Sequence, residues 1–124
     1  MWGEVYTSML ADIPGVRPQA VPTDCVTNYT LYGVLIEPSE FGLSRSELAE
    51  ALRLDGIGAR PYFHPPVHEH PCYSNGGAPR PRELPLTKWV SARVLCLPIL
   101  PKRPLDCAER IAREYDRFTR MPCR

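Results

Sequence analysis

Residues 56–73 read Gly56-Ile57-Gly58-Ala59-Arg60-Pro61-Tyr62-Phe63-His64-Pro65-Pro66-Val67-His68-Glu69-His70-Pro71-Cys72-Tyr73 and hold all three histidines of the chain. Each proline removes an amide donor and fixes φ, so a helix cannot run through the four prolines of this stretch. We predict a strand over residues 58–63 that opens into a stiff, extended loop. Loops rich in histidine, tyrosine and arginine are frequent sites of binding.

The segments before this stretch predict a helix, a connector and a strand. Apolar spacing favours an amphipathic helix over residues 2–12, with Val5, Met9 and Trp2 on its apolar face. Residues 16–24 are interrupted by prolines and predict a connector. Residues 28–36 are rich in β-branched and aromatic side chains, which is typical of a largely buried strand.

A capping box gives the strongest local prediction of the sequence. In Ser44-Arg-Ser-Glu47 the Ser44 hydroxyl can accept from the Glu47 amide while the Glu47 carboxylate reaches back. Leu48 and Leu52 follow at helical spacing, and Gly56 is a suitable residue just beyond the helix end. These features predict a helix over residues 44–55.

The segments after the histidine-rich stretch complete the predicted fold. A long loop over residues 64–84 is followed by a helix over 85–94, a short buried strand over 95–97, and a last helix over 104–120. Together with the earlier elements they predict one α+β domain over 1–124. Its predicted architecture is a small, mostly antiparallel three-stranded sheet with helices packed on one face.

Composition excludes several functional classes. The net charge is +1 and no basic block occurs, which disfavours nucleic-acid binding, and no apolar run reaches the roughly 18 residues of a membrane span. The N-terminus lacks the features of a signal peptide, so we expect a cytoplasmic protein. The five cysteines are irregularly spaced without a Cys-x-x-Cys pair, so reduced thiols are expected.

The histidine cluster leaves three interpretations open. His68 and His70 could face the same way on an extended segment and bind a metal, but no further histidine or suitable carboxylate is evident to complete a site. The histidines could also lie in a polar loop without a role. In the third interpretation one or two of them bind a ligand, and Arg60 contacts its phosphate or carboxylate. Cys72 as a nucleophile is disfavoured because no orienting Asn or Asp is identifiable.

Several motifs occur together in a recognisable order. Residues 28–32 lie on a predicted strand, and Asp55-Gly56-Ile57-Gly58-Ala59-Arg60 follows a predicted helix. After them come Tyr62-Phe63-His64-Pro65-Pro66-Val67-His68, Pro71-Cys72-Tyr73, Leu84-Pro85-Leu86-Thr87 and residues 94–99. This arrangement resembles the C-terminal small domain of the DegT/DnrJ/EryC1/StrS family. That family contains fold-type I aminotransferases that depend on pyridoxal phosphate (PLP) and form amino sugars on nucleotide-linked keto-sugars, or aminocyclitols. The resemblance implies that residues 1–14 correspond to the end of the family's inter-domain helix and 64–84 to its substrate-side loop.

The resemblance also implies what this chain lacks. The family's large domain, which carries the Schiff-base lysine and the cofactor, has no counterpart here, and neither Lys88 nor Lys102 lies in a motif similar to that of the cofactor lysine. No catalytic, cofactor-binding or metal-binding residue is therefore predicted in this chain, and PLP would be held by a partner chain or missing domain.

The resemblance, together with the chemistry of a nucleotide-sugar, predicts six substrate contacts: His68, Arg60, Tyr62, His64, Tyr73 and Asn28.

Three interpretations of the whole chain remain. It could be a small-domain subunit that completes an active site with a large-domain or full-length aminotransferase, or by self-association. It could be a non-catalytic binding or regulatory module, or an inactive fragment. An exposed apolar face on the helix over 2–12 and around Trp89 would favour the first.

Overall fold

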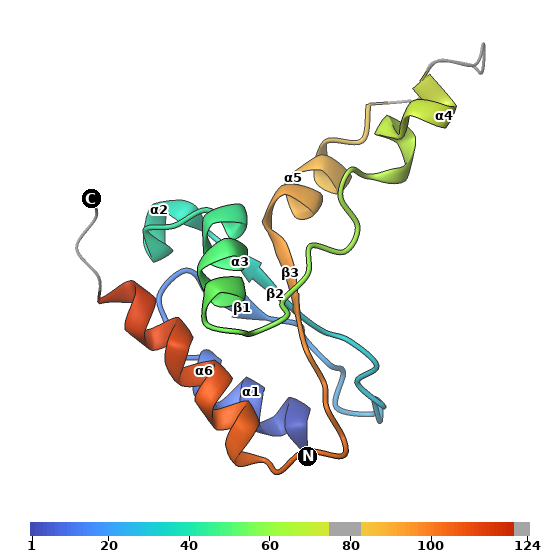
Figure 1. Ribbon diagram of the computed structural model, residues 1–124. Coiled ribbons are helices and arrows are strands. Elements are labelled where there is room, and N and C mark those ends of the chain that lie inside the picture. Colours follow the sequence, from blue (N-terminus) through green and yellow to red (C-terminus); the bar gives the residue numbers. More distant parts are fainter. Residues whose placement is uncertain (75–82, 121–124) are drawn as a thin grey trace.

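The centre of the molecule is an antiparallel sheet of three strands (Figure 1). The structure, a computed structural model, describes residues 1–74 and 83–120. The strands are β1 (Val16–Pro18), β2 (Tyr32–Ile36) and β3 (Val94–Leu97), in the order β1-β2-β3. In the register Val16 pairs with Ile36, and Val34 pairs with Leu95. The predicted α+β class with a three-stranded sheet is confirmed.

Six helices and one short turn accompany this sheet within the described residues. They are α1 (Trp2–Leu10), α2 (Pro38–Phe41), α3 (Arg45–Leu54), α4 (Pro71–Ser74), α5 (Pro85–Arg93) and α6 (Asp106–Thr119), with a single 3-10 turn, η1 (Val67–Glu69). The helices α1 and α6 pack on each other beside the sheet, whereas α4 and α5 extend away from the body of the domain (Figure 1).

The core lies on one face of the sheet because the burial of β2 alternates. Tyr32, Val34 and Ile36 are buried, while Gly33 and Leu35 between them are only partly covered. Period-two burial is the pattern of a strand with helices on one side. The other buried side chains that complete this core come mainly from α1, α3, β3 and α6: Trp2, Tyr6, Leu10, Leu48, Leu52, Leu95, Leu97, Ile111, Tyr115 and Phe118.

The capping box forms as predicted at the start of α3. The Ser44 hydroxyl accepts from the Glu47 amide at 3.3 Å, and Glu47 Oε2 accepts from the Ser44 amide at 2.7 Å. Gly56 has a positive φ of 76° directly after the helix, a conformation that glycine adopts without a side-chain clash. The helices predicted over 85–94 and 104–120, and the strand over 95–97, are likewise confirmed within a few residues.

Two predictions about strands are wrong. Residues 58–63 form no strand; Arg60 alone bridges Cys96, through N–H···O bonds of 2.9 and 2.8 Å. Pro61 has no amide proton, so the ladder cannot continue beyond Arg60. The third strand is instead Val16–Pro18, inside the predicted connector. Its proline is tolerated because β1 is an edge strand.

Three further details differ from the predictions. The loop after residue 63 is not simply extended, because η1 forms between two prolines and Pro71 occupies the first turn of α4, where a missing amide costs little. In α1 the buried side chains are Trp2, Tyr6 and Leu10, while Val5 and Met9 are half-buried at the edge. The predicted strand over 28–36 begins only at Tyr32. The middle of the 64–84 loop lies outside the described residues.

Candidate functional site

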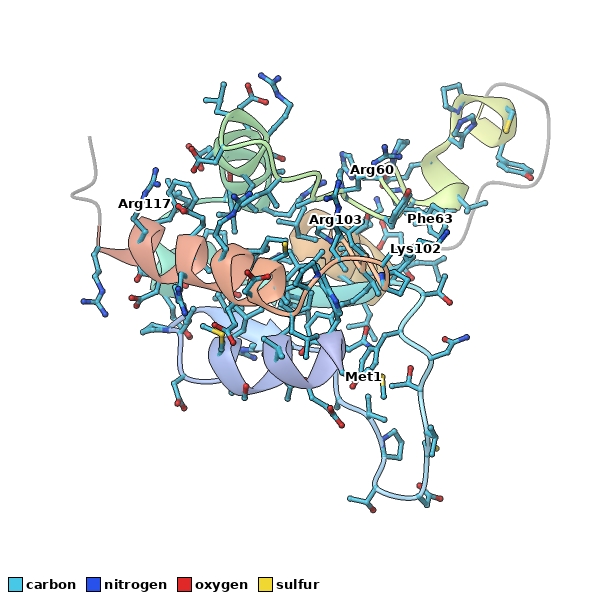
Figure 2. The ribbon with its side chains drawn as sticks, turned by 60° about the horizontal axis from the view of Figure 1, so that its bottom comes forward. Met1, Arg60, Phe63, Lys102, Arg103 and Arg117 are labelled. Carbon is cyan, nitrogen blue, oxygen red and sulfur yellow. The ribbon has the colours of Figure 1, made fainter. Side chains whose placement is uncertain are left out.

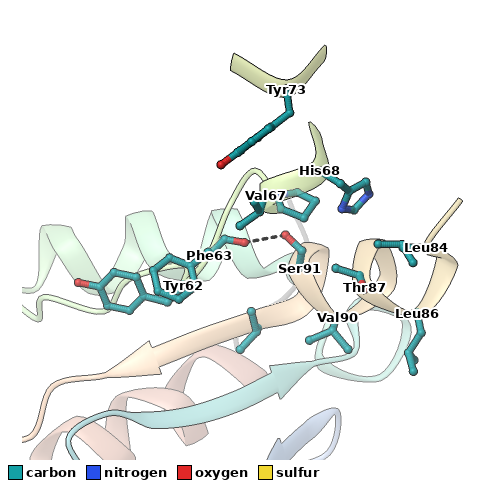
Figure 3. A pocket seen from close by; sticks show the side chains of 12 residues that line it. Tyr62, Phe63, Val67, His68, Tyr73, Leu84, Leu86, Thr87, Val90 and Ser91 are labelled. Atoms are coloured by element: carbon teal, nitrogen blue, oxygen red, sulfur yellow. Dashed lines mark hydrogen bonds between the residues drawn. The ribbon is translucent and has the colours of Figure 1, made fainter. Parts of the chain in front are cut away.

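A cavity of about 820 Å³ lies between the segment from Tyr62 to Tyr73 and helix α5 (Figure 3). Its walls are mostly apolar and include Phe63, Val67, Leu84, Leu86, Val90 and Val94. A few polar groups converge on it, from Tyr62, His68, Tyr73, Thr87 and Ser91. Apolar walls with a small number of placed polar groups are typical of a small-molecule site.

Ser91 joins the two walls of the cavity. Its side chain is buried, at 6% exposure, and its hydroxyl donates to the Phe63 carbonyl at 2.8 Å. The same oxygen lies 3.4 Å from His64 Nδ1. This contact ties the proline-rich segment to α5, so the segment keeps a defined position although it belongs to no strand (Figure 3).

His68 is the most notable polar group of the site. Its side chain is 14% exposed, and its Nε2 atom is buried with no hydrogen-bond partner among the described residues. Glu69 Oε1 lies 3.9 Å from this nitrogen, beyond hydrogen-bond distance. That carboxylate is already engaged by Lys88 Nζ at 2.9 Å, and this hydrogen bond lowers the pKa of the Glu69 carboxyl. An imidazole nitrogen without a partner at a cavity wall can bind a hydroxyl group of a ligand.

The six predicted substrate contacts separate into two groups. His68, Tyr62 and Tyr73 line the cavity, and His64 lies at its wall through its contact with Ser91. Arg60 is exposed and lies between α3 and the segment that carries Phe63, where it lines a different hollow (Figure 2). Asn28 accepts from the Thr30 hydroxyl at 3.3 Å and is not among the residues that line the cavity.

The sequence analysis missed the contribution of α5. Leu86 and Val90 line the cavity, as do Thr87 and Ser91, so each pair repeats at the i, i+4 spacing of a helix face. That spacing is visible in the sequence once a helix is placed over 85–94. The sequence does not show which side of this helix the sheet leaves uncovered, and that information is needed to assign this face to the cavity.

The rim of the cavity exposes large apolar side chains. Phe63 and Leu86 are each 72% exposed and Val67 66%. Trp89 of α5, which is not among the lining residues, is 38% exposed, whereas the aromatic side chains of α1 are buried. The expected apolar surface is thus present around Trp89 and absent from α1. Exposed apolar side chains gathered around one cavity, as Phe63, Val67 and Leu86 are, are typical of a contact surface.

The described cysteines and histidines form no metal centre. Cys25 and Cys72 are exposed, Cys96 is buried and Cys107 is partly covered, and all four are free thiols. His70 Nδ1 lies 3.1 Å from Cys72 Sγ. Among residues 1–74 and 83–120 no group of three or more His, Cys, Asp or Glu side chains could hold a metal ion, and no helix there is long and apolar enough to cross a membrane.

Comparisons with known proteins identify the family. The model of the DegT/DnrJ/EryC1/StrS aminotransferase family matches residues 2–115. The chain belongs to this family. It is 31% identical over 106 residues to the dTDP-4-amino-4,6-dideoxy-D-glucose transaminase of Shigella dysenteriae, and 32% identical over 97 residues to that of Escherichia coli. These alignments cover 86% and 77% of this chain but 28% and 25% of the relatives.

Solved structures of the family share the fold. The structure of DesI with its TDP-sugar product superposes with a TM-score of 0.83 at 30% identity, over 96% of this chain and 30% of that one. The structure of DesV from S. venezuelae, in complex with a ketimine intermediate, gives 0.82 at 28% identity, over 98% of this chain and 31% of the other. The chain therefore spans about 30% of these family members.

The family is PLP-dependent, but the residues of this chain do not fit a PLP site. A Schiff base needs a lysine at the cofactor, and the sequence has only Lys88 and Lys102. Lys88 pairs with Glu69 and Lys102 is exposed, and neither is among the residues that line the large cavity. No chemical step through PLP can be assigned to groups of this chain.

Proposed function

We propose that this chain is the small-domain part of a PLP-dependent aminotransferase that acts on a nucleotide-linked keto-sugar or aminocyclitol precursor. It would complete the active site together with a large-domain or full-length subunit that holds the cofactor. The observation that carries this proposal is the cavity between the Tyr62–Tyr73 segment and α5. A few polar side chains line it, among them His68 with its unpartnered Nε2 atom, and its rim exposes apolar side chains. The two relatives from Shigella dysenteriae and Escherichia coli are named as transaminases of a dTDP-linked amino sugar, which supports this substrate class.

The chemistry of the cavity suits a sugar. The carbon-rich faces of a pyranose ring pack on aromatic and aliphatic side chains such as Phe63 and Val67, while its hydroxyl groups need a few fixed polar partners. We assign this polar role to His68, Tyr62 and Tyr73. His64 would act indirectly, by fixing the segment to Ser91. Arg60 and Asn28 stay predicted substrate contacts, although neither lines this cavity.

The exposed rim supports the second half of the proposal. Phe63, Val67 and Leu86 present apolar surface to solvent at the mouth of the cavity. Covering such surface releases about 25 cal/mol for each Å² removed from water. A cofactor-bearing partner that docks on the rim would bury this surface and close the cavity in a single step.

A non-catalytic binding module is the alternative, and the absence of a lysine in the cavity favours it. Both candidates need the cavity to bind a nucleotide-linked sugar, so binding alone does not separate them. Only the first needs a cofactor-bearing partner, and only there would this chain change the partner's activity.

The binding step can be tested directly. We expect a dTDP-linked 4-amino sugar to raise the melting temperature of the chain and to shift the amide signals of η1 and α5. His68→Ala should weaken this binding several-fold, because one charge-neutral hydrogen bond contributes about 1 kcal/mol. The matched control is His70→Ala, because His70 is not among the residues that line the large cavity. Equal binding by wild type and the His68 variant would refute the assigned role of His68, and no binding at any concentration would refute the site.

A further inference from the structure

A second hollow, of about 460 Å³, lies between α3 and residues 57–61, and of its lining residues the function proposed above uses only Arg60. Three arginines line it, namely Arg45, Arg53 and Arg60, with Glu50 as its single acidic residue. Arg53 and Glu50 neutralise each other through two hydrogen bonds, of 2.7 and 2.6 Å. The two remaining guanidinium groups therefore give the hollow a positive field.

Arg45 is the unusual member of this set. It is 5% exposed, and its Nε atom is buried without a hydrogen-bond partner. No ion pair or hydrogen bond of its side chain is found within residues 1–74 and 83–120. Burial lowers the pKa of this guanidinium. Buried arginines are almost always paired, because removing a charge from water without a compensating partner is costly.

The other lining groups of the hollow add donors, and the Glu47 carboxylate in the same turn of α3 is engaged by the Ser44 amide at 2.7 Å. Arg60 has its backbone fixed by the two hydrogen bonds with Cys96, and its exposed side chain forms no ion pair with the described residues. Ser46 lines the hollow from the first turn of α3, a helix of ten residues. Because Ser44 and Glu47 already cap this turn, Ser46 contributes its exposed hydroxyl as a donor.

We propose that this hollow binds a phosphate group, held by Arg45 and Arg60 with Ser46 as a further donor. Guanidinium groups present paired N–H donors that match the oxygen spacing of a phosphate, so two of them can hold one dianion. Binding would supply the partner that the buried Arg45 lacks. The inference does not rest on the function proposed above, because it concerns another hollow, and of its residues only Arg60 is also a predicted substrate contact.

The test titrates inorganic phosphate into the whole chain at constant ionic strength and follows the amide signals of Ser46 and Gly58 by NMR. We expect saturable shifts at both amides, and no such shifts with chloride. Arg60→Gln should weaken binding about tenfold. The matched control, Arg110→Gln, removes an exposed arginine from α6 and should leave the affinity within about twofold of wild type.

A second variant guards against loss of fold. Arg45→Met keeps an unbranched apolar stem and removes the buried charge, so the variant should fold and be no longer stabilised by phosphate. The proposal is overturned if the shifts do not saturate, or if Arg110→Gln weakens binding as much as Arg60→Gln, which would indicate an adventitious ion only. Acetate binding as tightly as phosphate would overturn the assignment to a phosphate group.

Discussion

Two buried tyrosines offer a matched pair of substitutions with opposite expected signs. Tyr115 is fully buried, and its hydroxyl has no hydrogen-bond partner among the described residues. Tyr6 is equally buried, but its hydroxyl donates to the Pro98 carbonyl at 2.9 Å and so ties α1 to the end of β3. Replacing either tyrosine by phenylalanine removes the same atom from the same core, so the difference between the variants reports the hydrogen bond.

The expected magnitudes follow from these contacts. Burying a hydroxyl without a partner costs about 1–3 kcal/mol, so Tyr115→Phe should raise the free energy of unfolding by about 1 kcal/mol. Tyr6→Phe loses a hydrogen bond and leaves the Pro98 carbonyl unpaired, so it should lower that free energy by about 1–2 kcal/mol. The two variants should therefore differ by about 2–3 kcal/mol.

Urea unfolding followed by far-UV circular dichroism at neutral pH measures both variants against the wild type. Equal slopes with midpoints on opposite sides of the wild-type midpoint would agree with the structure. If Tyr115→Phe lost as much stability as Tyr6→Phe, the Tyr115 hydroxyl would have a partner, and this description of the core would be refuted.

Two further predictions concern the tether of the site and the behaviour at high pH. Ser91→Ala removes the hydrogen bond to the Phe63 carbonyl, so it should lower the free energy of unfolding by about 1 kcal/mol and speed amide exchange in η1. The surface control Ser8→Ala should leave this exchange unchanged. Unchanged exchange in Ser91→Ala would contradict the tether. Burial raises the pKa of Tyr6, Tyr32 and Tyr115, so the unfolded chain loses these protons near pH 10 while the folded chain retains them. The free energy of unfolding should therefore be insensitive to these groups below about pH 9. It should fall above about pH 10, by up to about 4 kcal/mol per pH unit, and a flat urea midpoint between pH 9 and 11 would contradict this.

The sequence predicted the elements that depend on local interactions. The capping box of Ser44 and Glu47 fixes the start of α3 from within four residues, and Gly56 ends it. The strand β2 was found from its β-branched and aromatic content. In each case the residues that decide the structure are neighbours in the chain, so no knowledge of distant segments was needed.

The errors arose where distant segments decide the outcome. The three residues of β1 become a strand only because β2 pairs with them, and Arg60 forms its single bridge only because Cys96 is opposite. The burial of Arg45 could not be expected either, because arginine is normally exposed.

The site was predicted in part for the same reason. The sequence predicts His68, Tyr62 and Tyr73 as site residues because they lie within one short segment, and all three line the cavity. The opposite wall comes from α5, which joins them only in the folded chain. Ser91, which holds the two walls together, gave no signal beyond its helical spacing.

The central claim is that this chain completes an active site whose cofactor is held elsewhere. The most direct measurement mixes the chain with the PLP-loaded product of a neighbouring aminotransferase gene and records the cofactor's absorbance on addition of a nucleotide-linked amino sugar. We expect a stable complex and a spectral change that requires this chain, and that Phe63→Asp, which places a charge on the exposed rim, abolishes. Two components that elute separately, with a spectrum that is the same with and without the chain, would contradict the claim.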